Sequence, residues 1–166
     1  MKGINWQSNW VRGITTALTV GMMVLIFFFS TQTAERSDKT SGRVAQIVID
    51  VLHPDFSSYG EEEQESIYNA TQHIVRKAAH FSEYTALGLL ALFCLESWRG
   101  KKKWNGGLGW AAGTLYAMTD EIHQLLIDGR SGQWTDVLID SSGVLTGVLL
   151  AWLILRRINP GEKEGD

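Results

Sequence analysis

Residues 13–30, GITTALTVGMMVLIFFFS, carry no charged side chain. A helix rises about 1.5 Å per residue, so this run is long enough to cross the hydrocarbon core of a bilayer. It is also longer than the apolar core of about 7–15 residues found in a cleavable signal peptide, and further apolar segments follow it. We therefore predict that it is a retained membrane anchor.

Three further segments have the same character. Residues 79–98, 104–127 and 134–155 are apolar over most of their length, with charges near their ends, and each is long enough for a spanning helix. The sequence predicts an all-α integral membrane protein in which residues 1–166 form one domain. The expected fold is a four-transmembrane-helix bundle with spans at 11–30, 79–98, 104–127 and 134–155. A helical extracytoplasmic loop, residues 31–78, is expected between helices 1 and 2.

The lysines and arginines predict the orientation, because connections rich in these residues stay in the cytoplasm. They cluster before the first span, in the connection 99–103, and after the fourth span. With four crossings, these three groups fall on one side of the membrane. We expect both termini to be cytoplasmic, while the loop 31–78 and the turn 128–133 face outward. Most of the tryptophans lie toward the cytoplasmic ends, as in an interfacial aromatic belt.

The third and fourth spans carry small residues at every fourth position, which allows helices to approach closely. These residues are Gly109, Gly113 and Ala117, then Gly143, Gly147 and Ala151. A short turn joins the two spans, so we predict that they pack as an antiparallel hairpin.

The outer loop contains two helical patterns. Apolar residues recur at helical spacing from Val44 to Leu52, and the pattern ends at His53-Pro54. The second pattern starts at Glu61 and is expected to run into the second span. The first helix is interpreted either as an amphipathic element lying flat on the membrane or as a lid over the bundle. The sequence leaves both interpretations open.

The composition restricts the class of partner. The net charge of −3 and the scattered basic residues give no indication of nucleic-acid binding. The single cysteine, Cys94, lies in an apolar stretch and cannot form an intrachain disulfide. Membrane lipids are therefore the expected surroundings of the chain.

Charged residues near the outer ends of the spans form the candidate site. A charge inside an apolar span costs roughly 2.5–3.5 kcal/mol, so such residues need a partner or a task. His80 and Glu83 are three residues apart, and Asp136 and Asp140 are four apart, so each pair shares a helix face. The candidate acid–base residues are His80, Glu83, Asp120, His123 and Asp140. The candidate ligand-binding residues are Gln32, Arg76, Lys77, Tyr84, Glu121, Gln124, Arg130 and Asp136.

Four interpretations of this cluster are open. The basic residues could neutralise the acids and hold the helices in register. The histidines and carboxylates could bind a metal ion, because Asp120-x-x-His123 and His80-x-x-Glu83 each put two ligands on one face. The basic residues could instead bind the anionic group of an amphiphile, with a histidine acting as general acid or base. A proton-coupled transporter is the fourth, although the inner halves of the spans offer few polar groups.

Several of these motifs resemble the VanZ family. They are Phe29-Ser30-x-Gln32, Arg76-Lys-x-x-His80-Phe-x-Glu83-Tyr84, Asp120-Glu121-x-His123-Gln124, Arg130, and Asp136-Val-x-Ile-Asp140-x-x-Gly143. The resemblance implies a small bacterial multi-pass protein of the plasma membrane. The family's namesake is associated with low-level resistance to teicoplanin, a glycopeptide antibiotic that acts on the cell wall. The resemblance implies no established reaction.

Together these observations predict recognition of an anionic lipid or cell-wall precursor at the outer leaflet, with a link to glycopeptide resistance. A lipid-linked precursor and the glycopeptide itself are the expected partners besides membrane lipids. The residues identify no cofactor, they do not decide whether a reaction is catalysed, and they leave the oligomeric state open.

Overall fold

The computed structural model describes residues 5–127, 129–130 and 132–158. Over these residues the chain forms five α-helices and one short 3-10 helix, without strands. The elements are α1 (Asn9–Ser30), α2 (Ala34–Leu52), η1 (Phe56–Ser58), α3 (Glu61–Arg99), α4 (Asn105–Gln124) and α5 (Trp134–Ile158).

Local sequence explains where several of these helices begin and end. The hydroxyl of Ser8 accepts a hydrogen bond from the backbone N–H of Val11 and caps α1. Three glutamates occupy the first turn of α3, where negative charge is favourable near the positive end of the helix dipole. The same helix ends at Gly100, whose φ of 68° lies in the left-handed region that glycine adopts without strain.

The stretch 31–78, between the first and second predicted spans, is helical, as expected. Its first helix, α2, ends directly before His53-Pro54. Its second helix is continuous with the second predicted span, because α3 runs unbroken for 39 residues. At about 1.5 Å per residue, α3 is nearly 60 Å long and exceeds the thickness of a bilayer core. The first half of α3 therefore projects beyond the bundle and carries α2 with it.

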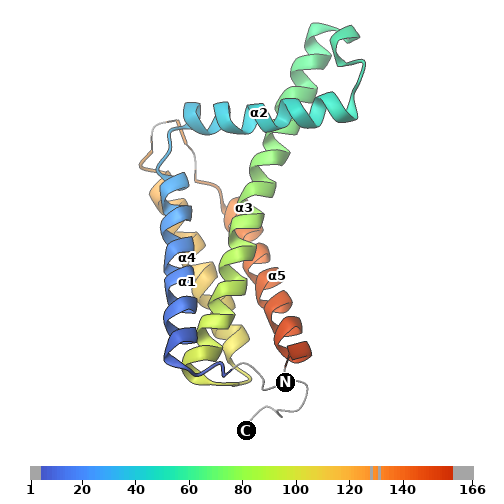
Figure 1. Cartoon of the computed structure of the whole chain (residues 1–166). Coiled ribbons are helices and arrows are strands. Elements are labelled where there is room, and N and C mark those ends of the chain that lie inside the picture. The colour runs from blue at the N-terminus through green and yellow to red at the C-terminus, as the bar shows by residue number, and fades with distance from the viewer. Residues whose placement is uncertain (1–4, 128, 131, 159–166) are drawn as a thin grey trace.

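Four helices form the bundle, and α2 crosses one of its ends. Figure 1 shows α1, α3, α4 and α5 side by side, with the start of α1, the α3–α4 connection and the end of α5 at one end. The α2 helix lies across the opposite end, which we call the loop end (Figure 1). The chain thus passes along the bundle four times.

The exterior of the bundle is more apolar than the surface of a protein surrounded by water. Large apolar side chains such as Val24, Leu115 and Leu149 are more than half exposed. Ser30, Asp120 and other polar side chains are buried instead. Within the described residues, α1, α3 and α5 are long and apolar enough to cross a membrane. This distribution is that of a membrane protein whose exterior contacts lipid.

The small residues of the last two predicted spans permit close packing, as expected, and α4 packs against α5. Gly143 and Gly147 of α5, however, lie against α3. A Cβ atom added to Gly143 would lie 2.6 Å from the carbonyl oxygen of Phe81, and one added to Gly147 would overlap the carbonyl oxygen of Thr85. The α3 and α5 backbones are therefore in direct contact. Gly113 of α4 instead accommodates a valine side chain of α5.

Candidate functional site

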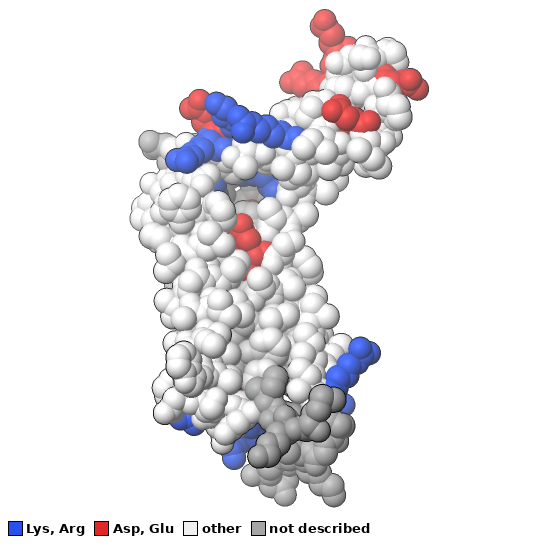
Figure 2. Space-filling view, in the orientation of Figure 1, with Lys and Arg blue, Asp and Glu red and all other residues white. Residues whose placement is uncertain are grey.

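A cavity of about 310 Å³ lies at the loop end, beneath α2. Residues from α1, α2, α3, α4 and the α4–α5 connection line it. Figure 2 shows a hollow at this level, with basic side chains above it and acidic side chains below it. The polar lining includes Gln32, Arg36, Arg76, His80, Glu83, Asp120 and Arg130. The cavity therefore brings together six of the residues that the sequence had assigned to a site.

The guanidinium groups lie on the α2 side of this cavity. Arg76 Nη1 forms an ion pair with Asp38 Oδ1 at 3.0 Å, and Arg130 Nη2 donates to the carbonyl oxygen of Phe29 at 3.4 Å. Arg130 is in the connection between α4 and α5. Burial lowers the pKa of Arg130 from its ordinary value, and the neighbouring charge of Arg76 lowers it further. An anion placed between these two groups would relieve their repulsion.

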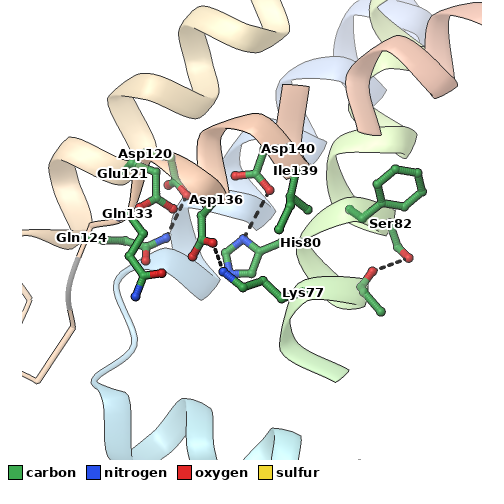
Figure 3. Close-up of polar contacts among 12 residues, drawn as sticks. Lys77, His80, Ser82, Asp120, Glu121, Gln124, Gln133, Asp136, Ile139 and Asp140 are labelled. Carbon is green, nitrogen blue, oxygen red and sulfur yellow. Dashed lines mark hydrogen bonds and ion pairs between the residues drawn. The ribbon is translucent and has the colours of Figure 1, made fainter. Parts of the chain in front are cut away.

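A second layer of polar residues lies behind the cavity, between α3 and α5. His80 Nδ1 is 3.7 Å from Asp140 Oδ1, and Lys77 forms an ion pair with Asp136. Figure 3 shows these two contacts one turn apart. Asp140 is fully buried, whereas His80 also lines the cavity. The imidazole of His80 therefore connects the cavity to the buried carboxyl group.

The acids of α4 complete this layer (Figure 3). Gln124 Nε2 donates to Asp120 Oδ2 at 3.2 Å, and the backbone N–H of Gln133 donates to Glu121 Oε2 at 2.9 Å. The second oxygen of each acid is buried and receives no hydrogen bond from the described residues, and the same holds for both oxygens of Asp140. A buried polar atom without a partner costs about 1–3 kcal/mol. Packing alone gives no reason to keep these carboxyl groups.

Two of the predicted site residues belong neither to the cavity lining nor to the polar layer behind it. His123 stacks on Phe27 of α1, with ring centroids 4.9 Å apart, and does not line the cavity. Tyr84 is fully buried beside Tyr116, whose hydroxyl donates to the carbonyl oxygen of Met23. Both residues therefore contribute to contacts between helices.

The interpretation of the cluster as a purely structural ion-pair network fits poorly. Arg76 had been considered as a partner for the acids of the spans, but it pairs with Asp38 of α2. Of the predicted acids, Asp136 has a lysine partner within ion-pair distance, while Asp140 has only a histidine. The charges of the cluster are thus not matched one to one.

The structure does not favour the metal interpretation. Over residues 5–127, 129–130 and 132–158, no three or more histidine, cysteine, aspartate or glutamate side chains come together in a group that could hold an ion. Asp120-x-x-His123 and His80-x-x-Glu83 have suitable spacing on their own helices, but they do not combine into such a group.

The residues of α2 that line the cavity were not predicted from the sequence. Besides Arg36, the cavity is lined by Ser37, Thr40, Ser41 and Val44 of this helix. These residues are three or four positions apart, so they share one helix face with the apolar residues that follow. Extending the amphipathic pattern backward from Val44 would have identified them.

Comparison with known proteins supports the resemblance drawn from the motifs. A family model described as VanZ/LLP1 matches residues 15–155. No curated protein and no solved structure gives a significant match. The matched range runs from α1 to α5 and includes every residue of the cavity. The chain therefore belongs to the VanZ/LLP1 family.

Proposed function

We propose that all four helices of the bundle cross the bacterial plasma membrane, with both termini in the cytoplasm. Three of them have sufficient length and apolarity on their own. The fourth, α4, has 20 residues, enough for about 30 Å of helix, and packs along α3 and α5. Lysines and arginines at the end opposite α2 support the orientation. The cavity then opens at the outer leaflet.

We further propose that this cavity binds the anionic head group of an amphiphile. The observation that carries the proposal is the position of Arg36, Arg76 and Arg130 around one cavity. Guanidinium groups suit phosphate and carboxylate because they donate two parallel hydrogen bonds. Apolar side chains of Ile26, Phe29 and other residues share the lining, which suits a ligand with a hydrocarbon portion.

The ligand class follows from the location of the cavity. A site between membrane-spanning helices is reached most directly by a molecule that is already in the bilayer. A phosphate-bearing lipid and a lipid-linked cell-wall precursor both present an anion at the head-group level. We propose this shared chemistry as the basis of recognition, and the experiments below distinguish the two sources.

Acid–base chemistry at this site is the second candidate function. The contact of 3.7 Å between His80 and Asp140 is the observation that favours it. The two groups are not hydrogen-bonded at this distance, but a slightly closer approach would let one ring nitrogen donate to the buried carboxyl group. That hydrogen bond would select the tautomer of the histidine and leave the other nitrogen to accept or donate a proton. Glu83 and Asp120 lie in the same lining and are further proton carriers. No nucleophile is assigned.

Arg130→Gln is expected to weaken binding of phosphatidylglycerol by about 10- to 100-fold, because a hydrogen bond to a charged group contributes about 1.5–3 kcal/mol. Binding would be measured by native mass spectrometry of the purified protein in detergent, with phosphatidylcholine as the neutral lipid. Arg43→Gln is the matched control, because Arg43 is exposed on α2 and does not line the cavity. Equal loss in both variants would contradict a specific site.

Competition with a soluble compound in the same binding assay distinguishes the two ligand sources. Competition by a soluble analogue of the lipid-linked precursor, with a diphosphate and a sugar, is expected if the precursor is the ligand.

Binding of the anionic lipid should also tighten as the pH falls, because Glu83 and Asp120 repel an anion only while they are ionised. If the affinity is unchanged by both competitor and pH, the precursor and the proposed coupling to these acids are both excluded.

We extend the proposal to glycopeptide resistance. A membrane protein that holds a cell-wall precursor would change how much of the precursor the antibiotic meets outside the cell. Cells producing the Arg130→Ala protein at normal abundance are expected to be more susceptible to teicoplanin than cells producing the unsubstituted chain. His123→Ala is expected to change susceptibility less, because His123 lies outside the lining. Unchanged susceptibility with Arg130→Ala would rule out the extension.

A further inference from the structure

One face of α2 lines the cavity over its first part and is apolar and exposed over its second part. Ser37, Thr40 and Val44 of this face line the cavity. The same face continues past the cavity, at spacings of three and four residues, to Ile47, Val48 and Val51. We call Val44, Ile47, Val48 and Val51 the apolar strip.

The apolar strip is exposed although its helix is firmly packed on another face. Ile47 is 64% exposed and Val51 is 73% exposed. Ala45 and Ile49, on the neighbouring face, are completely buried where α2 packs against α3. This exposure is therefore a property of one face, and α2 as a whole is held in place.

Polar contacts fix the rotation of α2 about its own axis. Gln72 Nε2 of α3 donates to the carbonyl oxygen of Asp38 at 2.9 Å, and Arg76 pairs with the same aspartate. Gly42 lies so close to Tyr68 that a side chain there would meet the tyrosine hydroxyl. With α2 locked against α3 in this way, the cavity-lining face points toward the bundle. The side turned away from it carries polar residues, including Lys39 and Gln46.

The direction of the face identifies what covers the strip. Since α2 crosses the loop end of the bundle, its cavity-lining face is directed along the bundle axis toward the side where a bilayer surrounds the helices (Figure 1). Beyond the bundle this face has the membrane surface beneath it. The apolar exterior of the bundle continues from there, so strip and exterior would contact the same lipid.

We propose that the apolar strip inserts into the outer leaflet of the bilayer that the bundle spans, and that α2 is an interfacial helix. This inference rests on the proposed membrane placement and not on head-group binding. Its consequence is that the membrane holds the roof of the cavity at the level of the head groups. An amphiphile could then reach the cavity by moving laterally beneath α2, without leaving the leaflet.

Spin labels at single cysteines test the depth of the strip. The full chain with Cys94→Ala would be reconstituted into vesicles of phosphatidylcholine and phosphatidylglycerol. Labels would be placed by Ile47→Cys and Val51→Cys, with Lys39→Cys as the control on the exposed polar side of α2. At Ile47 and Val51, collisions with oxygen are expected to exceed collisions with a water-soluble nickel complex, giving a ratio several-fold above that at Lys39.

Two outcomes would overturn the inference. The same oxygen-to-nickel ratio at all three positions would place the strip in water. Low access of both reagents at Ile47 and Val51 would show that protein, such as a second copy of the chain, covers the strip. Either result would leave the Arg130 binding experiment unaffected, so failure of this inference is distinguishable from failure of the proposed function.

Discussion

Gly147→Leu is expected to prevent assembly of the bundle. The glycine lies against the backbone of α3 at Thr85 and Leu89, and neither contact is with the movable end of a side chain. A leucine there must push α5 away from α3, and overpacking of well-packed sites typically costs about 1–3 kcal/mol or more. Because backbone cannot move aside as a side chain does, we expect a cost at or above the upper end of this range. Size-exclusion chromatography and thermal melting in mild detergent would measure the loss.

Gly21→Leu is the matched control for this substitution. Gly21 is also in the middle of a helix that is long and apolar enough to span a membrane, but an added Cβ there has no atom within 4 Å. The variant is expected to elute and melt within about 0.5 kcal/mol of the original protein, as substitutions outside packed sites usually do. Normal assembly of Gly147→Leu would mean that α3 and α5 are not in direct backbone contact.

Asp140→Leu is expected to stabilise the protein by about 1–3 kcal/mol, because it removes a buried carboxyl group that accepts no hydrogen bond from the described residues. The interpretation as a structural ion-pair network expects the opposite sign, since breaking a buried pair costs about 3–5 kcal/mol. Thermal melting in detergent measures the sign directly. A gain in stability would indicate that Asp140 is kept for a task other than stability.

Asp136→Leu provides the contrast within the same helix. Asp136 lies one turn from Asp140 and forms an ion pair with Lys77 (Figure 3). Its removal leaves a partly buried lysine without its carboxylate, so we expect destabilisation by about 1–3 kcal/mol. If the two substitutions lowered stability equally, the distinction between a paired structural acid and an unpaired one would be wrong.

The convergence of several polar side chains on one cavity could be predicted from residue spacing. His80 and Glu83 share a helix face near the start of their segment, and Asp120 lies toward the end of its own segment, at the same end of the bundle. A helical chain that passes back and forth across a membrane brings such ends together, so the amino-acid sequence is sufficient to predict that these side chains converge. All three line one cavity.

The sequence could not predict that α3 and α5 are in direct backbone contact. Small residues at Gly143 and Gly147 permit a close approach but do not say which helix approaches, and the partner is α3. Nothing in the sequence identifies Asp38 as the partner of Arg76, because Asp38 is distant in the chain and belongs to a separate amphipathic pattern. Both contacts depend on the rotation of one helix against another.

The residues of α2 that cover the cavity were the largest group that the sequence did not predict. Serines and threonines such as Ser37 and Thr40 are common on exposed helix faces, so their residue types alone did not indicate a lining. Their role follows from the position of α2 across the loop end, which is fixed by burial of Ala45 and Ile49 against α3. Tertiary packing, rather than local pattern, assigned these residues to the site.

Chemical labelling of Glu83 most directly tests the central claim that a water-accessible polar cavity lies among the spans at the outer leaflet. Glu83→Cys and Ser82→Cys would each be made in the Cys94→Ala background and treated from outside with a membrane-impermeant anionic methanethiosulfonate. The two positions are adjacent in α3, but Glu83 lines the cavity, whereas Ser82 is exposed on the side away from the cluster, where lipid would cover it (Figure 3). The expected result is rapid modification of Glu83→Cys that anionic lipid slows, with little modification of Ser82→Cys. Equal reactivity at the two positions, or none at Glu83→Cys, would contradict the claim.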